Sequence, residues 1–245
     1  MIKLIDNFEE YDFSSFENDI FFHRILSDSK TLSCFDDVMF YVCEDEEISA
    51  VISKVGGNVT LSAKKTAPFE EIREFLNVTG FLKILCNNEF SEQFDGRKEC
   101  GKILKIQGGC NFDCKAEKLY SENLKDMHGL VCNVFGFDGD YFTWVADLSH
   151  RMRHNSAHLY GIYCDDKLVS GAFSLFETEK SAVISSVATL EEYRHRGLGE
   201  KVVKTVIAEN NKELFVFTEN EKTEKWYKNM GFVPCEMWSE IENVL

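Results

Sequence analysis

Residues 182–199, AVISSVATLEEYRHRGLG, decide the fold of this chain, because a β-branched run leads into a turn with two glycines. The run AVISSVAT is typical of a buried strand. Gly197 and Gly199 have no Cβ, so the turn can adopt dihedral angles closed to other residues, and its N–H groups can approach an anion closely. Residues 200–210 follow with valines and an isoleucine on one face, which predicts an amphipathic helix.

The start of this helix predicts a phosphate site. The first N–H groups of a helix have no acceptor within it, and the helix dipole adds partial positive charge there, so an oxyanion is the natural ligand. Positive charge gathers around the turn through Arg194, His195, Arg196, Lys201 and Lys204. Glycine turns also occur between strands and helices without a ligand, so an empty turn and a solvated basic helix end are the alternatives.

A second segment follows the helix in a fixed order. Residues 214–218, LFVFT, predict a strand, and Asn220 opens a polar turn. Residues 224–230 predict a short helix that Gly231 ends as a left-handed cap. The resulting stretch at 226–232 is WYKNMGF.

Together these two segments resemble the GNAT superfamily of acyl-CoA-dependent N-acetyltransferases, most clearly from about residue 181 to 234. The phosphate turn of that superfamily has the form Arg/Gln-x-x-Gly-x-Gly/Ala, and its last helix often carries a tyrosine shortly before Gly-Phe. Glu191 and Thr189 depart from the usual proline and branched aliphatic residue, and neither departure removes a backbone amide. The matching residues are Tyr193, Arg194, Gly197, Gly199, Asn220, Tyr227, Gly231 and Phe232.

The resemblance implies a GNAT fold for residues 116–245, a mixed α/β (α+β) domain whose central, mostly antiparallel sheet is flanked by helices. The sequence pattern agrees, because two strand-like runs joined by the polar turn Asp165-Asp166-Lys167 predict an antiparallel hairpin that continues to the strand at 182. The expected elements are helices at 122–135 and 141–153 and strands at 158–164, 168–176 and 182–189.

Residues 1–115 carry a fainter version of the same order, which predicts a smaller N-terminal α/β domain, a degenerate copy of the half-fold. The stretch from Ser62 to Pro68 holds no glycine turn, so we expect no phosphate site there and a structural or substrate-covering role instead. The boundary is expected between Gly108 and Lys118. The expected elements are strands at 38–43, 48–55, 59–63 and 81–86 and a helix at 69–77.

The chemistry that the resemblance implies is direct attack of a primary amine, on a small molecule or a peptide, on acetyl-CoA through a tetrahedral intermediate. The backbone at 187–189 would pair with the pantetheine arm and supply an N–H for the oxyanion. Acetyl-CoA is the implied co-substrate, without a metal. The implied CoA-binding residues are Val187, Ala188, Thr189, Arg194, His195, Arg196, Gly197, Leu198, Gly199, Glu200 and Asn220.

Tyr227 stands at the position of the superfamily's general acid. A phenol with a pKa near 10 stays protonated at neutral pH and can protonate a departing thiolate. The alternative is a core aromatic beside Trp226. The residues leave the general base open, and a water chain could also take the proton. Glu177 and Glu179 are candidates. His150, His154 and His158 form another cluster, for which a solvated helix face is the alternative because the first two lie four apart on a charged helix.

Composition limits the other classes of function. With 245 residues, 44% hydrophobic and 28% charged, the chain is long and apolar enough for one large or two small cores. A net charge of −15 repels nucleic acid and attracts an amine cation. The alternative to an enzyme is a non-catalytic acyl-CoA-binding regulator, and the acceptor, the acyl chain length and the oligomeric state stay open.

No apolar run approaches 18 residues and the start resembles no secretory signal, so we expect a cytoplasmic protein without a membrane partner. Nine cysteines in an irregular, odd-numbered pattern are typical of free thiols. Cys110, Cys114, His128 and Cys132 have a spacing that fits no common zinc site, so no metal is expected.

Overall fold

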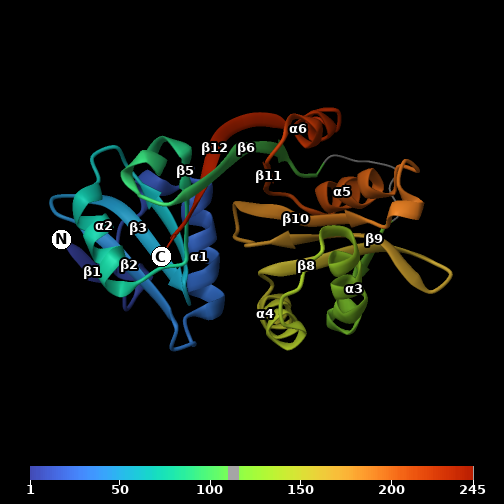
Figure 1. Ribbon diagram of the computed structural model, residues 1–245, viewed down its shortest axis with the longest axis horizontal. Coiled ribbons are helices and arrows are strands. Elements are labelled where there is room, and N and C mark those ends of the chain that lie inside the picture. Colours follow the sequence, from blue (N-terminus) through green and yellow to red (C-terminus); the bar gives the residue numbers. More distant parts are fainter. Residues whose placement is uncertain (110–115, 245) are drawn as a thin grey trace. The chain divides into compact units, whose positions relative to one another are not determined.

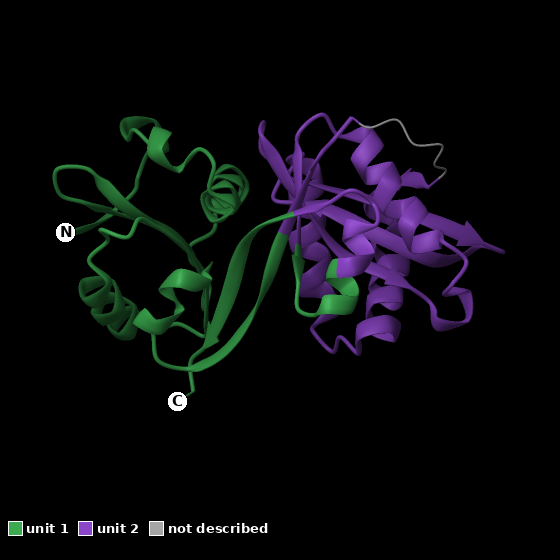
Figure 2. Ribbon diagram, turned by 90° about the horizontal axis from the view of Figure 1, so that it is seen from above, with its two compact units in different colours: residues 1–103, 217–224, 234–245 green, residues 104–216, 225–233 purple. Residues whose placement is uncertain are grey.

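The computed structural model describes residues 1–109 and 116–244 (Figure 1). The chain divides into two compact units (Figure 2). Unit 1 comprises residues 1–103, 217–224 and 234–245, and unit 2 comprises residues 104–216 and 225–233. The chain therefore passes between the units several times. The sequence-based domains at 1–115 and 116–245 stay a prediction.

Unit 1 is a sheet with a helix on each face. Its strand order is β1-β2-β3-β4-β5-β12, and all neighbours are antiparallel except β4 and β5. Ile72 and Leu76 of α2 pack on one face, and Phe22 and Ile25 of α1 pack on the other. The elements are β1 (Ile2–Leu4), α1 (Ile20–Leu32), β2 (Val38–Glu44), β3 (Ile48–Val55), β4 (Asn58–Ala63), α2 (Phe69–Thr79), β5 (Lys83–Asn87) and β12 (Val233–Glu242).

Unit 2 is also a sheet covered on both faces. Its strand order is β11-β10-β9-β8-β7, where β11 is Glu213–Thr218; β10 and β11 are parallel and the other neighbours are antiparallel. Val202 and Val206 of α5 pack on one face, while Met127 of α3 and Leu148 of α4 pack on the other. The elements are β7 (Glu117–Leu119), α3 (Leu124–Phe135), α4 (Tyr141–Arg153), β8 (Ala157–Cys164), β9 (Lys167–Leu175), β10 (Ser181–Thr189) and α5 (Leu198–Glu209).

Three further elements run through the unit boundaries: β6 (Arg97–Gln107), β11 (Glu213–Thr218) and α6 (Glu221–Lys228). Short 3-10 turns connect other elements, and η5 (Glu191–Tyr193) precedes the glycine turn. No helix in the part of the chain that the structure describes combines the length and apolarity needed to cross a bilayer.

The two units repeat one order of elements, as the sequence pattern predicts. In unit 1 the order β2-β3-β4-α2-β5 is an antiparallel meander, a helix and a strand that pairs in parallel with β4. In unit 2 the order β8-β9-β10-α5-β11 has the same pairing. The loop between β4 and α2 is therefore the counterpart of the loop that carries the glycine turn.

Sequence reasoning did not predict α1, β6 or β12. Helix α1 begins after Asp19, whose side chain accepts a hydrogen bond from the Phe21 N–H at 2.8 Å. The sequence pattern of α1 does not predict an amphipathic helix, because polar residues such as His23 and Ser27 are buried along with the apolar ones. Strand β12 pairs with β5, which lies some 150 residues earlier in the chain. A local sequence pattern therefore cannot predict this pairing.

Candidate functional site

The glycine turn takes a left-handed conformation at two positions, with φ of 61° at His195 and 73° at Gly197. Gly197 is the N-cap of α5, and no side chain caps this end of the helix. The first hydrogen bond of the helix runs from the Lys201 N–H to the Gly197 carbonyl at 3.0 Å. The amides of residues 198–200 precede it and have no acceptor within the helix, so they are open to an anion.

Gly199 allows α5 to begin close to the end of β10. A Cβ at this position would lie 3.2 Å from Oγ1 of Thr189 and 3.7 Å from Cζ2 of Trp226. Thr189 is itself held, because its Oγ1 lies 2.9 Å from Oγ of Ser170 on β9. Glycine at position 199 therefore allows the helix start to lie this close to the sheet.

Three of the five basic side chains around the turn make contacts with the turn, with the residues before it or with α5. Arg194 donates from Nε to the Thr189 carbonyl at 3.2 Å, and Arg196 donates from Nη2 to the Glu192 carbonyl at 2.8 Å. Lys204 forms an ion pair with Glu200, with 2.5 Å between Nζ and Oε1. Lys201 is exposed on the first turn of α5. It is thus better placed than the arginines to supply charge to a bound phosphate.

Strand β10 contains a β-bulge just before the turn. Ser185 pairs with Phe173 and Ala188 pairs with Gly171, so Ser186 and Val187 together oppose the single residue between them on β9. Ser186 has a φ of 51°, in the left-handed region. A bulge of this kind bends a strand and redirects its peptide groups. The sequence did not predict this bulge; the only signal is the adjacent pair Ser185 and Ser186 in the middle of the strand.

The edge of β10 that faces β11 is paired only at its start. The parallel pairing joins residues 181–183 of β10 to residues 213–215 of β11 and does not continue to the bulge or to residues 187–189. An extended ligand can add to a strand edge through main-chain hydrogen bonds. The predicted pantetheine-binding segment therefore lies where β10 and β11 have separated.

Tyr227 lies on α6 and is only 5% exposed. Its ring makes edge contacts with the rings of Trp226 at 4.8 Å and Phe232 at 5.2 Å between centroids. Burial raises the pKa of the Tyr227 hydroxyl above its usual value of 10.0, so the phenol stays protonated at neutral pH. The contacts are those of a core aromatic, and the protonation state is the one that a general acid requires.

Asn220 caps α6. Its Oδ1 accepts hydrogen bonds from the Thr223 N–H at 3.0 Å and from the Thr223 hydroxyl at 3.1 Å. This bonding explains why asparagine stands before the helix. Its contact with CoA stays a prediction.

Among the candidates for the general base, Glu177 is held in an ion-pair cluster. Its side chain is 6% exposed; Oε1 lies 2.8 Å from Nδ1 of His158 and Oε2 lies 2.8 Å from Nζ of Lys212. Burial acts to raise the pKa of this carboxyl, but the hydrogen bonds from His158 and Lys212 outweigh it and lower the pKa to about 2. Such an anion is a poor proton acceptor at neutral pH.

The other base candidates lie elsewhere. Glu179 is exposed in the loop before β10. The rings of His150 and His154 lie in contact at the end of α4, tilted by 32° with centroids 4.5 Å apart. Neither observation selects a base.

Of the four residues considered for zinc, His128 and Cys132 lie in the described ranges 1–109 and 116–244. Cys110 and Cys114 lie outside the described residues. His128 and Cys132 are one helical turn apart on α3, with Sγ 3.6 Å from both ring nitrogens. No group of three or more His, Cys, Asp or Glu side chains suited to a metal occurs in these ranges.

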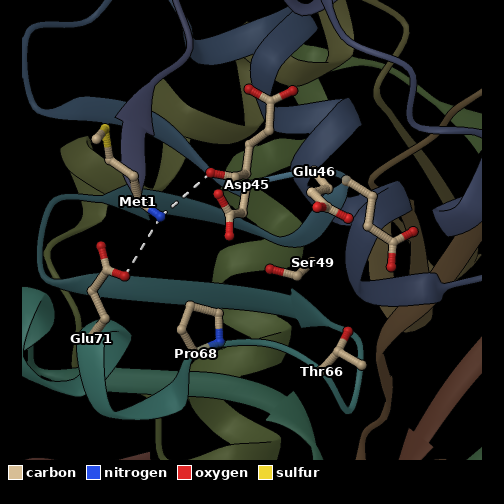
Figure 3. Close-up of a pocket in the computed structure, with 9 residues that line it drawn as sticks. Met1, Asp45, Glu46, Ser49, Thr66, Pro68 and Glu71 are labelled. Atoms are coloured by element: carbon tan, nitrogen blue, oxygen red, sulfur yellow. Dashed lines mark hydrogen bonds and ion pairs between the residues drawn. The ribbon is translucent and has the colours of Figure 1, made fainter.

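Unit 1 has an acidic cavity of about 320 Å³ beside the loop that is the counterpart of the glycine turn (Figure 3). The α-ammonium group of Met1 reaches it and lies 3.6 Å from Oε2 of Glu71. Because carboxylates repel phosphate, this lining is opposite to what a CoA diphosphate needs. The lining residues are Met1, Glu44, Asp45, Glu46, Glu47, Ser49, Thr66, Pro68 and Glu71.

Comparisons with known proteins agree with this geometry. The family model of the acetyltransferase (GNAT) domain matches residues 155–234. A search among curated proteins found no match. Several solved structures share the fold, at identities too low to show more than the fold.

An acetyltransferase of the GNAT family from Colwellia psychrerythraea is 14% identical, with 100% of both chains covered and a TM-score of 0.57. A putative GNAT-family acetyltransferase from Novosphingobium aromaticivorans is 16% identical, with 79% of this chain and 89% of that chain covered and a TM-score of 0.56. A tandem GNAT protein from the clavulanic acid biosynthesis pathway is 9% identical, with 90% and 87% covered and a TM-score of 0.58.

The matched segment runs from the start of β8 to the start of β12, so it contains the bulged strand, the glycine turn and α6. The fold around it is a mixed α/β fold that tandem GNAT proteins share. Residues 155–234 of this chain therefore match the acetyltransferase (GNAT) domain, and the solved structures show that the fold is shared.

Proposed function

We propose that this chain is an N-acetyltransferase that moves the acetyl group of acetyl-CoA to a primary amine of a small molecule or a peptide. The observation that carries the proposal is the set of three open amides at residues 198–200, at the end of a bulged strand that has separated from its parallel neighbour. An anion binds at such a helix start, and an extended arm binds along such a strand edge.

The residues present fit acetyl-CoA. The amides of residues 198–200 would hold its diphosphate, with added charge from Lys201, and the backbone of residues 187–189 would pair with its pantetheine arm. When bound, acetyl-CoA supplies an activated thioester carbonyl. A main-chain N–H at the bulge would donate to the negative charge that develops on this carbonyl oxygen.

Tyr227 would deliver a proton to the departing sulfur. Burial keeps its hydroxyl protonated, so the proton is present when it is needed. The pairing of Glu177 with His158 and Lys212 argues against that carboxylate as the base. The amine would then lose its proton to water or to a group in the acceptor site. The net charge of −15 favours approach of a cationic amine.

Two measurements on the purified full chain test the proposal. Calorimetry with CoA is expected to show saturable binding, and a thiol-release assay with a panel of primary amines is expected to show turnover for at least one of them. Binding without turnover for any amine would replace the enzyme with an acyl-CoA-binding regulator. No saturation at millimolar CoA in a folded sample would overturn both.

A further inference from the structure

Arg196 occupies a special place in the glycine turn, between two left-handed residues. His195 precedes it with a φ of 61° and Gly197 follows it with a φ of 73°. A residue with a Cβ pays a free-energy cost in this region, so something must hold His195 there. When right-handed and left-handed backbone conformations alternate in a short loop, successive N–H groups point toward one position, where an anion can bind. The conformation around Arg196 therefore decides whether the amides face a ligand.

The side chain of Arg196 folds back onto η5. Its Nη2 donates to the Glu192 carbonyl at 2.8 Å, and its Cζ lies 5.0 Å from the centroid of the Tyr193 ring. Both partners belong to the same short helix, so the guanidinium is fixed by a hydrogen bond and a cation–π contact together.

The Tyr193 ring, which contacts Arg196, is held in place by the rest of unit 2. The Tyr193 N–H donates to the Leu190 carbonyl at 2.9 Å, and Tyr193 packs against the core that α3, β8 and β9 form. The contacts of Arg196 thus tie the middle of the turn to the sheet of unit 2.

Resting on the proposed function, we propose that Arg196 is a positioning residue. It holds the turn so that the amides of residues 198–200 face the diphosphate of CoA, and its charge is used inside the turn and not on the phosphate. The sequence alone favours the opposite role, a direct counter-charge. Tyr193 has the same positioning role, because its uncharged ring holds the guanidinium of Arg196.

Three single variants separate these roles. Arg196→Lys keeps the charge but loses the planar group that stacks and donates to Glu192. Tyr193→Leu removes the stacking surface without changing any charge. Lys201→Met is the matched control, because it removes a charge beside the turn without touching the contacts of Arg196. Thermal unfolding of each variant shows whether it has folded.

The readouts are the Kd of CoA at two ionic strengths and the Kd of S-acetylpantetheine, which lacks the nucleotide diphosphate. We expect Arg196→Lys and Tyr193→Leu each to weaken CoA binding about tenfold, to leave S-acetylpantetheine binding unchanged and to keep the salt dependence of the wild type. The double variant should be no weaker than Arg196→Lys alone, because that change already removes the contact with Tyr193 as well as the hydrogen bond to Glu192. Lys201→Met should lower the salt dependence.

The proposal is wrong if both variants bind CoA as the wild type does, or if they weaken S-acetylpantetheine binding equally, which would indicate a general loss of structure. Since Arg196→Lys is a mild change, it keeps the test decisive even where Tyr193→Leu fails to fold. A wild type that binds no CoA would instead remove the proposed function, and this inference with it.

Discussion

Nδ1 of His158 lies 2.8 Å from Oε1 of Glu177, and the ionised carboxylate accepts the hydrogen bond. The other oxygen of Glu177 accepts from Nζ of Lys212, which also donates to the Thr178 carbonyl at 2.7 Å. The cluster joins the start of β8, the loop between β9 and β10 and the residue before β11. A carboxylate that sequence reasoning considered as a base is thus a structural link on the sheet that carries the candidate site.

This cluster predicts an acid-sensitive stability. The pKa of Glu177 falls from 4.5 to about 2 on folding, so its contribution is present above the unfolded value of 4.5 and is lost as the pH falls from there toward 2. Glu177→Gln should lower the free energy of unfolding at pH 7 by about 3 kcal/mol. Urea denaturation at pH 7 and at pH 3 measures the difference, which should shrink at the lower pH.

The matched control for this change is Glu179→Gln, two residues away and exposed. It should alter the free energy of unfolding by less than about 0.5 kcal/mol. Equal stability of wild type and Glu177→Gln at pH 7 would contradict the structural role of the cluster.

Gly199→Ala should weaken CoA binding, because the added methyl group would contact the side chain of Thr189. The added Cβ would lie 3.2 Å from Oγ1 of Thr189, which pushes the helix start and its amides away from β10. We expect about a tenfold increase in the Kd of CoA, measured by calorimetry, equivalent to ~1.4 kcal/mol. In the double variant Thr189→Ala/Gly199→Ala the obstructing atom is gone, so affinity should return toward that of the wild type.

Gly129→Ala is the control glycine substitution. A Cβ at this position on α3 meets nothing within 4 Å, so alanine should raise the helix stability by about 0.5–1 kcal/mol and leave CoA binding unchanged. If Thr189→Ala did not rescue Gly199→Ala, the close contact between the helix start and β10 would not be the reason for the glycine.

The sequence predicted those parts of the structure whose causes are local. The run AVISSVAT and the glycine turn specify β10 and the start of α5, because strand propensity and the freedom of Gly197 act within a few residues. The meander of unit 1 was equally predictable from its alternating strands. Pairing over long distances was not, and so β12 opposite β5 was missed.

The same distinction separates the predicted from the unpredicted parts of the site. Unpaired N–H groups occur at the start of every helix, so the amides at residues 197–200 could be named in advance. The bulge at Ser186 depends on the register of β10 against β9, and the fold-back of Arg196 depends on where the Tyr193 ring lies. Both features depend on tertiary structure. The sequence alone therefore favoured a role for Arg196 as a counter-charge to the phosphate.

Tyr227→Phe tests the general acid. The variant removes only a hydroxyl from a ring that packs between Trp226 and Phe232, so folding and the Kd of CoA should change little. If the hydroxyl protonates the departing sulfur, kcat should fall by about 100-fold or more. Steady-state thiol release together with CoA calorimetry separates the two effects. An unchanged kcat would leave Tyr227 as a core aromatic.

The chain should bind one CoA although it contains two units with the same order of elements. In unit 1 the counterpart of the glycine turn ends in Pro68, which has no N–H, and the Phe69 N–H already donates to the Ala67 carbonyl at 2.9 Å. The adjacent cavity is lined by carboxylates, which repel a diphosphate.

Calorimetric titration of the full chain is therefore expected to give a stoichiometry of one CoA per chain. Gly199→Asp places a carboxylate beside the open amides of α5 and should abolish all of this binding, not half of it. Because Gly199 lies in unit 2, the variant leaves the loop before Pro68 intact. Residual binding of one CoA in Gly199→Asp would show that unit 1 holds a phosphate site despite its acidic lining.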